Sequence, residues 1–101
     1  MTEHLHLDIV TPDRIAVSAP VEMVVAPGTE GVFGVMAYHA PFISSLKPGV
    51  IEIYEGSTVI TRFAISGGYA EVSNNKCVIL AEQLVEPGQV DRIAAAEEAR
   101  L

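Results

Sequence analysis

The chain has 101 residues, of which 50% are hydrophobic, with a formal net charge of −7. Its length suits one domain, and its hydrophobic content excludes a disordered chain. The acidic balance, without a basic cluster, excludes nucleic-acid phosphates as partners. No apolar run approaches the ~20 residues that span a bilayer, and the N-terminus predicts no signal peptide. A single cysteine, Cys77, cannot form an internal disulfide, which fits a reducing cytosol.

Short runs in which apolar and polar residues alternate predict half-buried β-strands along most of the chain. The clearest runs are Leu5–Ile9, Val21–Val25, Val50–Glu55, Thr58–Ser66 and Lys76–Glu82. Turn residues separate them at Thr11-Pro12-Asp13, Pro27-Gly28, Pro48-Gly49, Glu55-Gly56-Ser57, Gly67-Gly68 and Asn74-Asn75. Strands spaced about ten residues apart predict a mainly β fold, an antiparallel sandwich or barrel.

The pattern changes after Glu86-Pro87-Gly88, where Ala and Glu become frequent. Residues 89–101 place Val90, Ile93, Ala94 and Leu101 near one helical face, so we expect a short C-terminal α-helix. A lone helix of this length is marginal in water and needs a surface to dock on. We therefore divide the chain into a β domain over residues 1–87 and a helical segment over residues 88–101.

Two glycine-bearing stretches carry most of the specific information. The first is Pro27–Val35 followed by His39-Ala40-Pro41, and the second is Lys47–Ile51 followed by Ser66–Val72. With the flanking strands, this ordered pattern resembles the N-terminal domain of the epsilon subunit of F-type ATP synthases over residues 5–86. The resemblance implies a β-sandwich of about ten short strands. It also implies a non-catalytic rotor-stalk subunit, peripheral at the cytoplasmic face of the bacterial inner membrane, that couples proton flow to ATP synthesis without inserting into the membrane.

The resemblance further implies two protein partners and no cofactor. Glu30 and His39 are expected to contact the ring of c subunits. Positional matches place Thr11, Ile43, Ser44 and Val50 on or near the surface that faces the gamma subunit. The chain departs from the family's pattern in this region, because Ala37-Tyr38 replaces the usual Pro-Gly and Val32 replaces a common acidic residue. These departures leave the exact ring contacts open.

In the family a helical hairpin follows the sandwich, whereas this chain stops within what would be the first helix. The sequence leaves open whether this is natural or a truncation. Some relatives bind ATP through Ile/Leu-Asp, two variable residues and Arg-Ala at this helix. Here Asp91 matches, but Ala94 occupies the arginine position. We therefore expect no bound ATP and no inhibition of hydrolysis by this C-terminus.

The sequence gives little support to catalytic, metal or phosphate sites. Glu30 and His39 could exchange protons, but no nucleophile, metal or substrate pocket is signalled beside them. His4 and His6 would share one strand face, yet a metal normally needs three or four ligands, and only His39 remains as another histidine. Gly67-Gly68 predicts a tight strand turn rather than a phosphate loop, since no lysine or helix follows.

Two alternative classes of function remain open besides the stalk subunit. One is a small β-sandwich enzyme, and the other is a free-standing ligand-binding module. Either would need several polar residues converging in a pocket, whereas the sequence offers only Glu30, Tyr38 and His39 in one stretch.

Overall fold

The computed structural model describes residues 3–85. Within this range the backbone forms ten β-strands and no helix. The strands are β1 (Leu5–Thr11), β2 (Arg14–Val21), β3 (Met23–Gly28), β4 (Gly31–Met36), β5 (Phe42–Leu46), β6 (Gly49–Glu55), β7 (Thr58–Ile65), β8 (Gly68–Ser73), β9 (Lys76–Ala81) and β10 (Leu84–Val85). The expected β fold of about ten short strands is therefore confirmed, whereas the expected helix lies outside the described residues.

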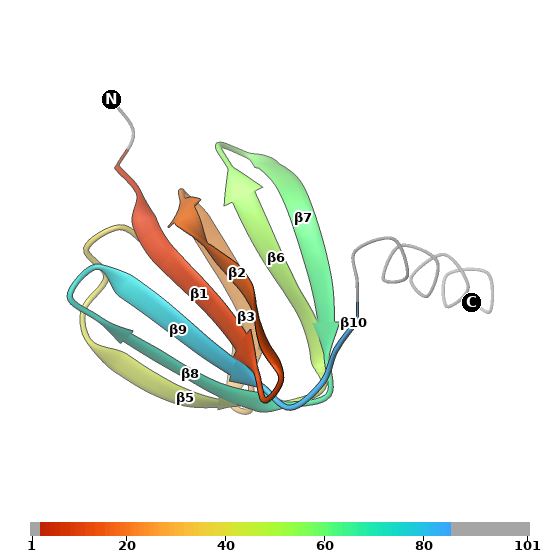
Figure 1. Cartoon of the computed structure of the whole chain (residues 1–101). Coiled ribbons are helices and arrows are strands. Elements are labelled where there is room, and N and C mark those ends of the chain that lie inside the picture. The colour runs from red at the N-terminus through yellow and green to blue at the C-terminus, as the bar shows by residue number, and fades with distance from the viewer. Residues whose placement is uncertain (1–2, 86–101) are drawn as a thin grey trace, which may run out of the picture.

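The ten strands form one continuous sheet that folds over on itself. Their order is β10-β7-β6-β3-β5-β8-β9-β1-β2, and β4 pairs with β3 beside this path. The sheet bends where β3 meets β5, because these strands share only the pair Gly28↔Leu46. Figure 1 shows the result: β5, β8, β9, β1 and β2 form one layer, and β3, β6 and β7 form the other. All pairings are antiparallel except that between β1 and β9.

Alternate side chains of the strands point inward and fill the space between the two layers. Leu5, Leu7 and Ile9 of β1 have no exposed surface, whereas the residues between them face outward. Buried Val, Ile, Leu and Ala dominate the core, with Phe63 as its only buried aromatic residue among residues 3–85. Packed interiors of this kind deform little under load, so the sandwich is a stiff platform for its loops.

Cys77 is a small residue of the core. Its side chain is 1% exposed in β9, and burial raises the pKa of the thiol to about 12. The neighbouring Lys76 faces the opposite side, where its Nζ lies 3.2 Å from Asp8 Oδ2. The cation that would activate a thiol is therefore directed away from this one.

Candidate functional site: an uncharged interaction surface

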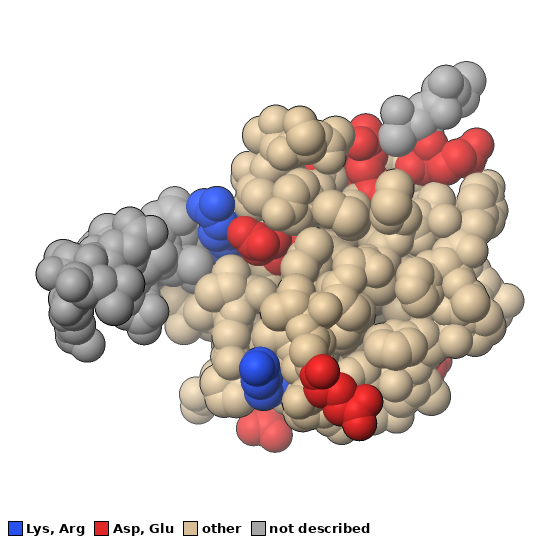
Figure 2. Space-filling view, turned by 180° about the vertical axis from the view of Figure 1, so that it is seen from behind, with Lys and Arg blue, Asp and Glu red and all other residues tan. Residues whose placement is uncertain are grey.

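The outer surface over β3, β4 and β5 differs from the rest of this acidic chain. Between Glu22 and Glu52 the only Asp, Glu, Lys or Arg residues are Glu30 and Lys47. All three strands are free of charge, with the sequences MVVAPG, GVFGVM and FISSL. Figure 2 shows that on the face seen from behind Figure 1 the charged side chains lie toward the margins around a broad uncharged area.

Large apolar side chains are exposed on this surface. Val32 is 70% exposed and Met36 59% exposed on β4, and Ile43 is 59% exposed on β5. Scattered apolar residues are normal on protein surfaces, but several gathered on a surface without charge are typical of contact with another protein. We call this region, defined by the outward faces of β3, β4 and β5, the uncharged surface, and Glu30 in the turn before β4 lies at its edge.

A hollow of about 450 Å³ lies within the uncharged surface. Its lining comes from the β3–β4 turn with the start of β4 and from β5, namely Thr29–Phe33 and Phe42–Ser45. Backbone bonds join the two sides, because Thr29 N donates to Ser45 O at 3.0 Å and Lys47 N donates to Pro27 O at 2.9 Å. The Phe33 and Phe42 rings meet edge to face with centroids 4.9 Å apart. The hollow is thus shaped by main-chain bonds and an aromatic pair.

The Pro-Gly motifs make this arrangement possible. A Cβ atom added at Gly49 would lie 2.8 Å from Pro27 Cβ, closer than real side-chain atoms approach. The start of β6 can therefore pass close to β3 only because position 49 has no side chain. At Gly28 an added Cβ atom would lie 2.7 Å from Gly31 O and 2.9 Å from Phe33 Cδ1, so this glycine instead permits the tight turn into β4.

The two residues expected to contact the ring lie in the turns at the two ends of β4. Glu30 is exposed in the turn before Gly31 and contributes to the hollow. His39 is exposed after Met36, with its backbone N donating to Met36 O at 3.2 Å and its ring centroid 6.0 Å from that of Phe42. The strand separates these two side chains, so they offer two contact points rather than one catalytic pair.

The four residues expected to face the gamma subunit do not share one surface. Ile43 points outward from β5, whereas Ser44 is half-buried and its Oγ donates to Ser45 O at 2.9 Å. Val50 is 39% exposed on β6, in the other layer. Thr11 is buried in the β1–β2 turn, where its hydroxyl donates to Asp13 Oδ1 at 2.6 Å. Of the four, the structure brings Ile43 and Ser44 to the hollow beside Glu30.

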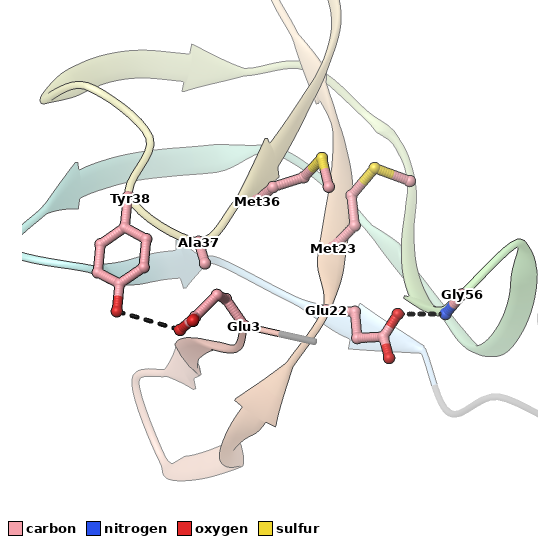
Figure 3. Close-up of a pocket in the computed structure, with 7 residues that line it drawn as sticks. All are labelled: Glu3, Glu22, Met23, Met36, Ala37, Tyr38 and Gly56. Atoms are coloured by element: carbon pink, nitrogen blue, oxygen red, sulfur yellow. Dashed lines mark hydrogen bonds between the residues drawn. The ribbon is translucent and has the colours of Figure 1, made fainter. Parts of the chain in front are cut away.

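Tyr38 occupies the position where the family usually has glycine, and its backbone has φ of 62°. A non-glycine residue in this region carries strain, and it is held here by two hydrogen bonds. Its N–H donates to Asn75 Oδ1 at 2.8 Å, and its hydroxyl donates to Glu3 Oε2 at 3.2 Å (Figure 3). The hydrogen bond to the Glu3 carboxylate raises the pKa of the phenol. The sequence did not signal these contacts, which lie 37 and 35 residues away.

A second hollow, of about 470 Å³, lies beside this loop. Figure 3 shows the Glu3, Glu22 and Tyr38 side chains around it, with Met23 and Met36. It combines two carboxylates with two thioethers. In the first hollow the Ser44 hydroxyl donates to Ser45 O rather than to the Glu30 carboxylate, so it is not activated by a base, and the geometry favours surfaces for contact.

The fold and the uncharged surface define an interaction domain of the β-sandwich class. The chain belongs to the family of the ATP synthase delta/epsilon chain β-sandwich domain, whose family model matches residues 4–87. Among residues 3–85 there is no helix with the length and apolar character needed to cross a membrane.

Individual relatives agree with this membership. The ATP synthase epsilon chain of Rhodospirillum rubrum is 47% identical over 83 residues, which are 82% of this chain and 62% of the relative. The ATP synthase epsilon chain of Parvibaculum lavamentivorans is 42% identical over 101 residues, covering all of this chain and 76% of the relative. The chain thus spans less than two thirds of the Rhodospirillum rubrum relative's length.

Solved structures agree as well. A chain in the Euglena gracilis mitochondrial ATP synthase structure containing OSCP, F1 and the c-ring superposes with a TM-score of 0.77 at 30% identity, covering 96% of this chain and 64% of that one. A chain in the central stalk and c-ring structure from Tetrahymena thermophila has a TM-score of 0.69 at 20% identity, covering 85% of this chain and 67% of that one. The second likeness supports the fold alone.

Proposed function

We propose that this protein is a non-catalytic subunit of the central stalk of a bacterial F-type ATP synthase. It binds the gamma subunit and the ring of c subunits, and so couples proton flow to ATP synthesis. It works as a peripheral part of the F1 sector at the cytoplasmic face of the inner membrane. The observation that carries the proposal is the uncharged surface of a chain whose net charge is −7, in a fold that belongs to the delta/epsilon family.

The physical argument starts from the cost of desolvation. A charged group at the centre of a protein interface must be paired or it opposes binding. The uncharged surface has no such group on its three strands, and it exposes apolar side chains at Val32, Met36 and Ile43. Burying these side chains against a partner would favour association, while the acidic remainder keeps the chain soluble.

Ile43 is the residue of this surface that we assign most directly to the gamma subunit. It is exposed, apolar and at the rim of the hollow. Ser44 lies next to it on β5, and its hydroxyl donates a hydrogen bond to Ser45 O. Val50 and Thr11 lie elsewhere in the sandwich, so we propose only peripheral contributions from them.

Glu30 and His39 are proposed to contact the ring. Both residues are exposed in turns at the ends of a strand. Binding residues commonly lie on loops that a rigid scaffold holds in position, so these two turns are suitable contact points. Their separation by β4 lets them meet two polar loops of a ring at once. The stiff core between the layers then transmits load with little deformation.

A paired substitution tests the gamma assignment. Ile43→Asp places a charge on the uncharged surface, whereas Ile60→Asp makes the same change at an isoleucine that is 55% exposed on β7 in the other layer. We expect Ile43→Asp to weaken binding of the purified gamma subunit of the same organism by at least tenfold and Ile60→Asp to change it by less than about threefold. Equal losses would refute the assigned surface, and absence of any gamma binding by the unaltered chain would refute the function.

A further inference from the structure

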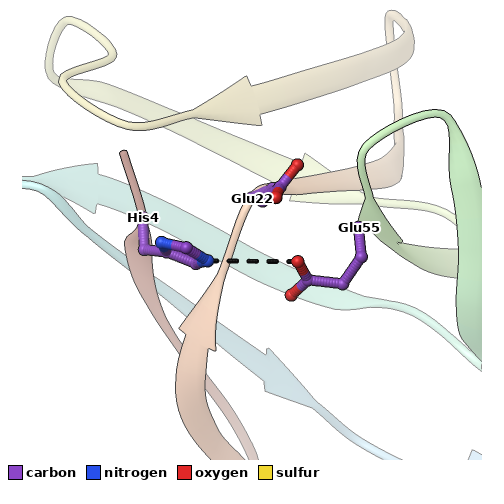
Figure 4. A group of neighbouring side chains, drawn as sticks. All are labelled: His4, Glu22 and Glu55. Atoms are coloured by element: carbon purple, nitrogen blue, oxygen red, sulfur yellow. Dashed lines mark ion pairs between the residues drawn. The ribbon is translucent and has the colours of Figure 1, made fainter. Parts of the chain in front are cut away.

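Three possible metal ligands meet at the corner of the sandwich where the N-terminal segment enters. His4 precedes β1, Glu22 lies in the bend between β2 and β3, and Glu55 ends β6. One ligand atom of each lies within 4.8 Å of the others, and His4 Nε2 is 3.9 Å from Glu55 Oε2. Figure 4 shows the imidazole and the Glu55 carboxylate directed toward each other, with Glu22 beside them.

Hydrogen bonds outside the cluster hold these segments in place. One Glu22 oxygen accepts a bond from the Gly56 backbone N–H, as Figure 3 shows, and its second oxygen is left for another partner. The His4 backbone oxygen accepts a bond from Asn75 Nδ2 at 3.0 Å. The Gly56 bond orients the Glu22 carboxylate, as hydrogen bonds to ligating carboxylates do in metal sites, and the Asn75 bond fixes the backbone that carries the His4 side chain.

We propose that His4, Glu22 and Glu55 form a binding site for a divalent transition-metal ion, with Zn²⁺ as the best fit. One imidazole and two carboxylates supply three protein ligands and two negative charges, and water completes a tetrahedral shell. An imidazole favours zinc over magnesium or calcium.

The three side chains must draw together to hold an ion. Ligand atoms about 2.0–2.1 Å from zinc lie roughly 3.3 Å apart in a tetrahedron. The 3.9 Å separation of His4 Nε2 and Glu55 Oε2 must therefore close by about 0.6 Å, and the widest separation in the cluster, up to 4.8 Å, by up to about 1.5 Å. The side chains of His4 and Glu55 are each 40% exposed, which leaves them free to rotate inward and leaves an entry path for the ion.

The other possible ligands in the described chain are less suitable. His6 Nε2 lies 3.0 Å from Asp8 Oδ1 and 3.2 Å from Ser18 Oγ, and Lys76 Nζ already neutralises Asp8 at 3.2 Å. Cys77 is buried. His6 therefore provides a matched control, since it is an exposed histidine two residues from His4 beside a carboxylate that already has a cation.

An ion at this corner would join three separate segments. It would connect the entry to β1 with the β2–β3 bend and the β6–β7 hairpin, and so bridge the two layers of the sandwich. Metal binding to the folded state alone stabilises that state by mass action. The site thus predicts a protein whose melting temperature depends on zinc.

The test uses the full 101-residue chain without a polyhistidine tag, treated with chelator and titrated with ZnCl₂ by isothermal calorimetry. We expect one ion per chain with a Kd near 10 μM. His4→Gln and Glu55→Gln should each weaken binding by at least tenfold, and His6→Gln should change it by less than twofold. At a zinc concentration 100 times the Kd, the melting temperature of the unaltered chain should rise by about 10 °C.

Circular dichroism of each metal-free variant checks that it is folded. The side chains of His4 and Glu55 are each 40% exposed, so both variants should fold, and each tests the site independently. A Kd weaker than 1 mM for the unaltered chain would overturn the proposal. So would an equal loss in His6→Gln, or an equal rise in melting temperature with MgCl₂.

Discussion

Gly68, at the start of β8, offers the sharpest test of how this sequence specifies the sheet. Its φ is 158°, and a Cβ atom added there would lie 2.1 Å from the Leu80 carbonyl oxygen and 3.1 Å from Ala81 Cα. Both atoms belong to the backbone of β9, which pairs with Gly68 through Ala81. Gly68→Ala therefore cannot be relieved by rotating a side chain, and the two strands must separate.

The magnitude follows from two costs. An ordinary Cβ contact needs about 3.4 Å or more, so the strands must move apart by more than 1 Å at the Leu80 oxygen. Overpacking of this kind typically costs about 1–3 kcal/mol, and the unfavourable φ adds about 1–2 kcal/mol. We expect a loss of about 2–5 kcal/mol in the free energy of unfolding, a large part of a small domain's stability.

Gly56→Ala is the matched control. Gly56 has φ of 62° in the β6–β7 turn, and an added Cβ would meet nothing within 4 Å. The free energy of unfolding of this variant should decrease only by the conformational cost of about 1–2 kcal/mol. The comparison separates the steric cost at Gly68 from the cost of a positive φ.

Urea unfolding followed by circular dichroism measures both variants. With an m value of about 1.3 kcal/mol/M, the midpoint should fall by roughly 2–4 M for Gly68→Ala and by roughly 1 M for Gly56→Ala. Equal midpoints for the two variants would refute the claim that close approach of β9 excludes a side chain at position 68.

Three further results are expected. Tyr38→Gly relieves the strain of the positive φ but loses the hydrogen bond to Glu3, so its free energy of unfolding in a thermal melt should stay within about 1 kcal/mol of the original. Tyr38→Ala loses the same bond and keeps the strain, so it should be less stable than Tyr38→Gly, and the reverse order would contradict the strain. The Cys77 thiol should react with Ellman's reagent at pH 8 only after unfolding, and rapid labelling of the folded chain would contradict its burial. The folded Cys77 keeps its proton up to about pH 12, whereas the unfolded thiol loses its proton near pH 9. The free energy of unfolding should therefore decrease as the pH rises from 9 to 12, and Cys77→Ala should show a smaller decrease over the same pH range.

Much of the fold was predictable because its signals are local. Alternation in Leu5–Ile9 and Lys76–Glu82 identified strands whose inward residues are buried, and Asn74-Asn75 identified a turn in which both residues have positive φ. Such signals need only neighbouring residues. The parallel pairing of β1 with β9 was not predictable in this way, because it joins residues about 70 positions apart.

The site was predictable only in part, for the same reason. Glu30 and His39 were singled out from the motif around them, and the structure places both in exposed turns, while their contact with a ring stays a prediction. The sheet bends at the pair Gly28↔Leu46. This bend places Ile43, Val50 and Thr11 in different parts of the sandwich, and the sequence pattern does not locate it. The cluster of His4, Glu22 and Glu55 joins three distant segments and left no pattern in the sequence.

The position of β1 inside its layer has a consequence for biosynthesis. The first strand of this sheet in chain order is hydrogen-bonded on one edge to β2, which follows at once, and on the other to residues 76–80 of β9. Until those residues emerge, the hairpin of β1 and β2 has an open edge, although the strands of the opposite layer, β3, β6 and β7, have already been made. The sheet therefore cannot be completed until β9 has been synthesised. Until then the unpaired edge of β1 can pair with other polypeptide chains, so we expect it to need protection by chaperones.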